Sequence, residues 1–80
     1  MIRALFFGPV AERVGARQIE VDFRPGLTWR ALRDQLAALH SEAFEIVSIV
    51  AVDGRRVAES DAAPLRDGAE VVFMSAFSGG

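Results

Sequence analysis

The feature that most constrains the fold is one amphipathic helix pattern with strand patterns on both sides of it. Four large apolar side chains recur at intervals of three, four and three residues and so form one stripe of a helix: Trp29, Leu32, Leu36 and Leu39. Thr28 is the expected N-cap, and Leu27 and Leu32 flank it as a hydrophobic staple. We expect this helix to bury its stripe against a sheet.

Two strand patterns precede the helix. Residues 2–7 are largely apolar at both parities, which is typical of a central strand covered on both faces. Residues 18–23 alternate strictly, with Ile19, Val21 and Phe23 pointing inward. The connection contains the Gly8-Pro9 break and a short helical turn over residues 10–14. These patterns predict a loose antiparallel hairpin.

Three strand patterns follow the helix, which fades at residues 40–42. Residues 46–52 are rich in β-branched side chains, and Asp53-Gly54 after them favours a type I′ hairpin turn. Residues 55–58 form the short, charged return strand, and residues 70–74 form the last strand. The order ββαβββ predicts a single α+β domain over residues 1–80, with one main helix across a mixed sheet. The predicted core includes Ile19, Val21, Leu32, Leu36 and Val71.

Several classes of chemistry have no basis in this composition. A net charge of −2 without a basic stripe argues against a nucleic-acid partner, and the absence of cysteine excludes disulfides and thiol nucleophiles. His40 is the one histidine, so no transition-metal site is expected. The acidic pairs Glu20/Asp22 and Glu42/Glu45 fit a solvated surface. No apolar run approaches the ~18 residues of a membrane span, so the expected location is the cytoplasm.

The sequence ends in Gly79-Gly80, after an uncharged stretch without proline. We expect residues 75–80 to form an extended tail with a free carboxylate on Gly80. Glycine has no Cβ and passes through a slot too narrow for other residues, so Gly79 would give the tail clearance. A frayed terminus, or an interaction domain with an incidental Gly-Gly, is the alternative interpretation.

A docking surface is predicted from strand alternation. Met74 shares a strand side with Glu70, and Phe7 shares one with Arg3, which marks both sides as the wetter ones. If these strands are neighbours, Phe7 and Met74 lie together in an exposed patch. The alternative is that Phe7 packs under Val10 or Val14. The predicted partner-binding residues are Phe7, Val57, Met74 and Phe77.

Several stretches resemble one family. Residues 5–15, the helix start at Leu27-Thr28, residues 64–71 and the Gly79-Gly80 end are similar to the small subunit of molybdopterin synthase, a ubiquitin-related sulfur carrier with a β-grasp fold. The resemblance covers essentially the whole chain. One departure is that Ser75-Ala76-Phe77 stands where tails of this family often carry two prolines before the last apolar residue.

The resemblance implies a carrier that is not an enzyme on its own and binds no cofactor. A ubiquitin-activating-like adenylyltransferase would use ATP to adenylate the Gly80 carboxylate, and sulfur transfer would give a C-terminal thiocarboxylate. The tail would then enter the large subunit of molybdopterin synthase, in a heterotetramer, and donate sulfur for the molybdopterin dithiolene. Carriers for thiamine synthesis or tRNA thiolation, and a ubiquitin-like modifier conjugated through Gly80, remain open alternatives.

Overall fold

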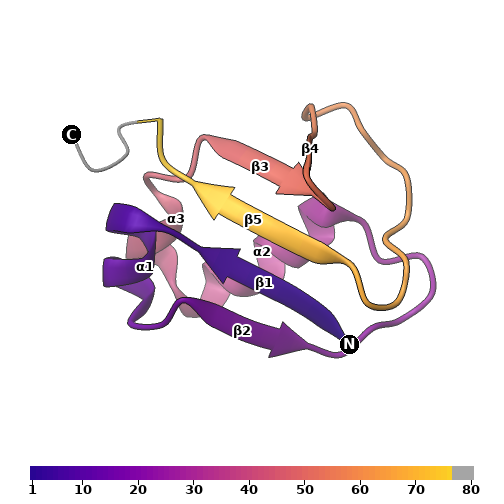
Figure 1. Cartoon of the computed structure of the whole chain (residues 1–80), viewed down its shortest axis with the longest axis horizontal. Helices are drawn as coiled ribbons and strands as arrows, with labels where there is room; N and C mark the ends of the chain where they lie inside the picture. The colour runs from indigo at the N-terminus through magenta and orange to yellow at the C-terminus, as the bar shows by residue number, and fades with distance from the viewer. Residues whose placement is uncertain (77–80) are drawn as a thin grey trace.

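A computed structural model describes residues 1–76 and shows a mixed sheet in the order β2-β1-β5-β3-β4 (Figure 1). The central strands β1 and β5 are parallel, and the other neighbouring strands are antiparallel. The predicted mixed sheet and the antiparallel hairpin of the first two strands are confirmed. The strands are β1 (Ile2–Phe6), β2 (Gln18–Val21), β3 (Ile49–Val52), β4 (Arg55–Arg56) and β5 (Glu70–Met74).

The main helix α2 (Trp29–Leu39) crosses behind the sheet in the view of Figure 1, from near β4 towards β2. Its start is the predicted one, because the Oγ1 atom of Thr28 accepts a hydrogen bond from the backbone N–H of Ala31 at 3.2 Å. The core lies between α2 and the sheet. It includes Val21, Leu32, Leu36 and Val71, as predicted.

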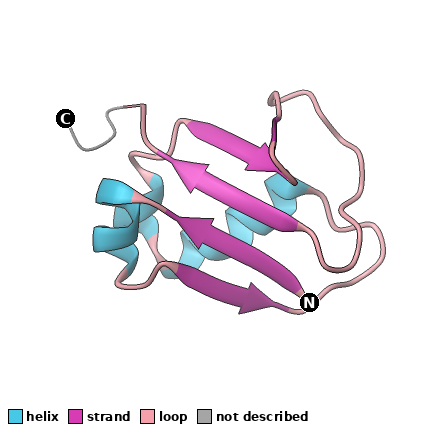
Figure 2. Cartoon of the chain, in the orientation of Figure 1, coloured by secondary structure: helices cyan, strands magenta, loops and turns pink. Residues whose placement is uncertain are grey.

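Two short helices, α1 (Gly8–Val14) and α3 (Ser41–Phe44), cover one end of the sheet (Figure 2). The predicted turn over residues 10–14 is thus a longer helix, with Pro9 in its first turn and Gly15 at φ 85° ending it. The sequence analysis did not predict α3. Its Phe44 ring packs edge-on against Phe6 and Phe73, with ring centroids 6.2 and 5.0 Å away, so α3 is stabilised by tertiary contacts.

The turn between β3 and β4 follows the prediction. Asp53 and Gly54 both have positive φ, 49° and 82°, as a type I′ turn requires. The return strand is shorter than predicted and ends at Arg56, although the Val57 N–H still donates to the Val50 carbonyl at 2.9 Å.

The prediction that α2 buries its whole apolar stripe is wrong at Leu39. Leu39 belongs to the apolar stripe of α2 by spacing, yet its side chain is 74% exposed. The helix reaches the edge of the sheet at β2, where no further strand lies beneath it among residues 1–76. Ile19, on β2, is half-buried for the same reason.

Two strand boundaries also differ from the predicted ones. The second strand ends at Val21 rather than at residue 23, and the third begins at Ile49 rather than at residue 46. Within residues 1–76, no helix has both the length and the apolar character needed to cross a membrane.

Candidate functional site

The sheet has one face that α2 does not cover, which we call the free face. Alternate residues of each strand point to it, and the buried residues between them point to α2. At one end of the free face, Arg3 lies between Glu20 on β2 and Glu70 on β5 and forms an ion pair with Glu70. This end is charged.

Towards the other end the free face becomes apolar. Leu5 on β1 pairs with Val72 on β5, which in turn pairs with Ala51 on β3. One row further on, Met74 pairs with Ile49. We define the apolar patch as the half-buried or exposed residues of these rows together with Phe7: Leu5, Phe7, Ile49, Ala51, Val72 and Met74.

Phe7 completes the apolar patch beside Met74. Phe6 on β1 pairs with Phe73 on β5, and these two strands are parallel. Phe7 and Met74 each come one position later, so they lie next to each other at the same end of the two strands. The Phe7 side chain is 54% exposed, whereas Val10 is fully buried, so Phe7 is not packed beneath α1. The structure therefore brings Phe7 and Met74 together on an accessible surface.

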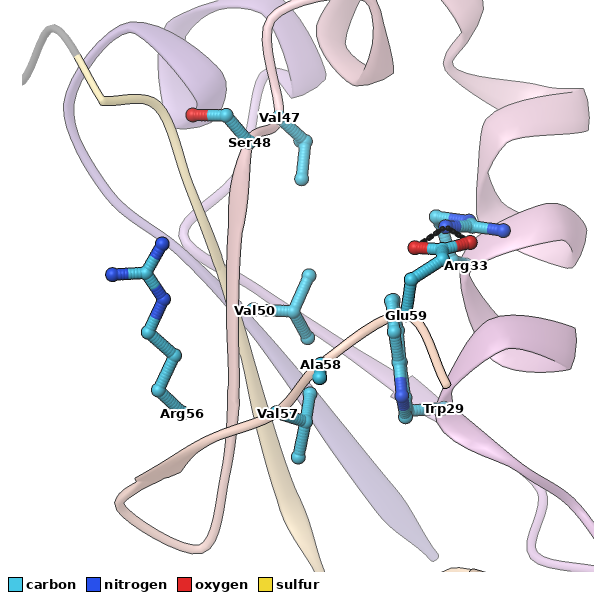
Figure 3. A pocket seen from close by; sticks show the side chains of 9 residues that line it. All are labelled: Trp29, Arg33, Val47, Ser48, Val50, Arg56, Val57, Ala58 and Glu59. Atoms are coloured by element: carbon cyan, nitrogen blue, oxygen red, sulfur yellow. Dashed lines mark hydrogen bonds and ion pairs between the residues drawn. The ribbon is translucent and has the colours of Figure 1, made fainter. Parts of the chain in front are cut away.

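Val57 lies on the other side of the sheet, apart from the apolar patch. It lines a groove of about 570 Å³ with Val50 and Trp29, between α2 and the β3–β4 hairpin (Figure 3). The β4 register explains this placement, because Arg56 pairs with Ala51 and therefore takes the free-face position. β4 has only two residues, so the sequence alone does not show on which face of the sheet the following residue, Val57, lies.

An ion pair closes the rim of this groove. The Nη1 atom of Arg33 donates to both carboxylate oxygens of Glu59, at 2.9 and 3.0 Å. Hydrogen bonding to Glu59 raises the pKa of the Arg33 guanidinium, which also lies 5.0 Å from the centroid of the Trp29 ring. Trp29 is buried, as expected of a core residue. The Arg33–Glu59 ion pair beside it connects α2 to the loop after β4.

The chain leaves β5 at the same end of the sheet as the apolar patch. The Ser48 N–H donates to the Met74 carbonyl at 2.9 Å, and the Ala76 N–H donates to the Ser48 Oγ atom at 2.8 Å. Ser75 is buried. The folded body thus reaches Ala76, two residues into the predicted tail, while the predicted site residues Phe77, Gly79 and Gly80 lie outside the described residues.

Ser48 is the residue of this site that the sequence analysis missed. It is the one polar side chain within the apolar stretch 46–52, which is the signal that marks it in hindsight. Its partner Ala76 is 28 residues away in sequence, so no local pattern predicts their hydrogen bond.

The described residues place an accessible apolar patch at the end of the sheet where the chain leaves β5. Within residues 1–76, no three histidine or acidic side chains gather closely enough to bind a metal ion. His40 lies between α2 and α3. The arrangement can present a C-terminal segment beside an apolar contact surface.

Comparison with solved structures shows the ubiquitin-like β-grasp fold. A Pyrococcus furiosus protein assigned as molybdopterin converting factor subunit 1 is 21% identical, with a TM-score of 0.78, over 92% of this chain and 94% of that one. SAMP1 from Haloferax volcanii is 23% identical, with a TM-score of 0.77, over 99% and 98% of the two chains. A second crystal structure from Haloferax volcanii, of small archaeal modifier protein 1, which SAMP1 abbreviates, is 22% identical, with a TM-score of 0.72, over 92% and 94% of the two chains.

A search of curated proteins gave no match. The sequence model of the ThiS family matches residues 4–80, which is nearly the whole chain, so this chain belongs to the ThiS family of ubiquitin-like sulfur carriers.

Proposed function

We propose that this chain is the sulfur-carrier subunit of a molybdopterin synthase, acting in molybdenum cofactor biosynthesis. The observation that carries the proposal is the position of the apolar patch beside the last described residues. Met74 belongs to the patch, and Ala76, two residues later, is bonded to Ser48 at the same end of the sheet. A partner bound to the patch would therefore meet the C-terminal segment directly.

The chemistry proposed for Gly80 has two steps. A carboxylate oxygen of Gly80 bonds to the α-phosphorus of ATP on an adenylyltransferase partner, and pyrophosphate leaves. A sulfur nucleophile at the oxidation level of hydrosulfide then attacks the acyl carbon, AMP leaves with that oxygen, and a thiocarboxylate results. The chain supplies the acyl group and the docking surface, and the partner supplies the ATP site.

The proposed acceptor complex is a heterotetramer with the catalytic large subunit. Gly79 has no side chain and would let the thiocarboxylate enter the active site of that subunit. Phe7 and Met74 would form the centre of the contact, as aromatic and methionine side chains often do at interface cores. The similarity to molybdopterin converting factor subunit 1 supports this partner.

The test combines partner capture with the mass of the C-terminus. The tagged chain is purified from its own cell, and bound proteins and its intact mass are determined together. We expect an adenylyltransferase, a large subunit and a mass shift of one oxygen-to-sulfur exchange. Deletion of Gly80 should abolish the mass shift while the chain stays folded. A sulfur-transfer activity that survives this deletion would overturn the carrier proposal.

A ubiquitin-like protein modifier is the second candidate, because the chain is similar to a small archaeal modifier protein. The same Gly80 adenylate would then react with a lysine amine of a target protein. Covalent adducts of the chain in the lysate, removed by Gly80 deletion, distinguish this function. Capture of a thiamine-pathway or tRNA-thiolating enzyme in place of the large subunit would reassign the acceptor and keep the carrier chemistry.

A further inference from the structure

Leu39 is exposed because the apolar stripe of α2 extends past β2, the edge strand of the sheet. The apolar stripe of α2 continues from Leu36, which is 2% exposed, to Leu39, which is 74% exposed. Beneath Leu39 the sheet ends at β2, and a groove of about 390 Å³ lies between β2 and α2. Apolar and polar side chains both line it: Ile19, Val21, Leu36 and Leu39, together with Glu20, Asp22, Arg24 and Gln35.

The outer edge of β2 offers backbone hydrogen-bonding groups for a further strand. The Phe6 N–H donates to the Arg17 carbonyl at 2.9 Å, and in an antiparallel pair the direction of bonding alternates along the strand. The backbone groups of Gln18 and Glu20 therefore point away from β1. The sheet order places no other strand on that side among the described residues.

We propose that this edge binds an extended segment of a partner protein by strand addition, in which apolar and basic residues alternate. Side chains on the helix side of the added strand would cover Ile19 and Leu39. Those on the free-face side would lie beside Glu20, with Asp22 following at the strand end. Neither of these two carboxylates forms an ion pair within residues 1–76, so basic side chains would complement them.

Charge distinguishes this occupant from a second copy of the chain. In a two-fold antiparallel pairing of two copies through β2, centred on Val21, Glu20 of one copy would lie opposite Asp22 of the other. Like charges across neighbouring strands destabilise the pairing. A basic segment of another protein has the opposite effect.

The edge of β2 is remote from the proposed carrier site. β2 and β3 are separated by β1 and β5 in the sheet, and Ser48 holds the C-terminal segment beside β3. A partner at β2 could therefore stay bound while Gly80 reacts elsewhere, and its binding does not depend on the proposed function.

The experiment is an NMR titration of the full chain, labelled with ¹⁵N, with a capped pentapeptide in which arginine and valine alternate. We expect amide shift changes at Gln18, Glu20 and Leu39. Leu39→Ala should weaken binding about tenfold, because the buried leucine contact is lost. Ala38→Ser, at the preceding position of α2 and outside the groove, is the control and should bind like the parent.

Two further peptides test the mode of binding. A peptide N-methylated at alternate residues keeps the charges and loses the backbone donors, and it should not bind. A peptide of alternating glutamate and valine should bind at least several-fold more weakly than the basic one. The proposal is overturned by no binding at millimolar basic peptide, by shifts confined to the apolar patch, or by equal binding of the methylated peptide. A dimer in sedimentation that Leu39→Ala dissociates would assign the edge to a second copy instead.

Discussion

The backbone N–H of Ala76 donates to the Oγ atom of Ser48 at 2.8 Å, which ties the chain after β5 to the residue just before β3. The Ser48 N–H also donates to the Met74 carbonyl, so one residue holds two successive points of the departing chain. This fixes where the chain leaves the sheet, next to the apolar patch. The side-chain contact can be removed without disturbing the backbone contact.

Ser48→Ala is predicted to release Ala76 and leave the fold intact. The variant loses one hydrogen bond at an exposed site, which is worth about 0.5–1.5 kcal/mol at most. We expect amide hydrogen exchange at Ala76 to accelerate while Phe73 and Val71 stay protected. Ser41→Ala, an exposed serine at the start of α3, is the control and should leave Ala76 exchange unchanged. Unchanged Ala76 protection in the Ser48 variant would contradict the anchoring role.

Leu36 and Leu39 form a matched pair within one helix stripe. Leu36→Ala should lower the free energy of unfolding by about 2–5 kcal/mol, because it leaves a cavity in the core. Leu39→Ala removes a side chain that is already exposed and should change it by less than about 0.5 kcal/mol. Urea unfolding of both variants measures the difference. Equal effects would show that Leu39 is buried in solution.

Phe7→Glu and Met74→Arg are predicted to weaken association with the two proposed partners by more than about 2 kcal/mol each. Both place a charge in the centre of the apolar patch, yet neither residue is in the buried core. Calorimetry with the large subunit and with the adenylyltransferase measures the loss, and circular dichroism checks the fold. Leu39→Glu, an equal change at the end of α2 above β2, should keep parental affinity. Parental affinity of the Phe7 and Met74 variants would exclude the apolar patch as the docking surface.

The contact between Asp67 and the Met1 amine makes the stability of the fold depend on pH in the acid range. Its carboxylate lies 2.6 Å from the Met1 amine, and this hydrogen bond lowers the Asp67 pKa below its ordinary value of 3.8. A lowered folded-state pKa stabilises the fold above the unfolded-state pKa, and the effect is lost as the pH falls through the folded-state value. Asp67→Asn should therefore melt below the parent near neutral pH, and the gap should close in strong acid.

Thermal melts from about pH 6 to about pH 2 test this dependence. Asp22→Asn is the control, because its carboxylate has no ion-pair partner within residues 1–76. A gap between the Asp67 variant and the parent that stays constant with pH would show that the Met1 contact does not act through charge.

Much of this fold could be read from local patterns. The N-cap at Thr28, the type I′ turn at Asp53-Gly54 and the alternation that turns Phe7 and Met74 away from the core depend on neighbours in sequence. Backbone preference and side-chain period act over a few residues, so a single sequence contains them. The Gly79-Gly80 pair, too, is read directly from the sequence.

The tertiary structure decided what depends on strand order and on the width of the sheet. Leu39 and Leu36 have the same spacing signal, and only the end of the sheet at β2 leaves Leu39 exposed. Phe7 and Met74 meet because β1 and β5 are parallel neighbours. Val57 faces Trp29 because of the register of β4, and Ser48 reaches Ala76 across β3 and β5. These contacts join residues far apart in sequence, whose pairing is set by the packing of the whole sheet rather than by any local preference.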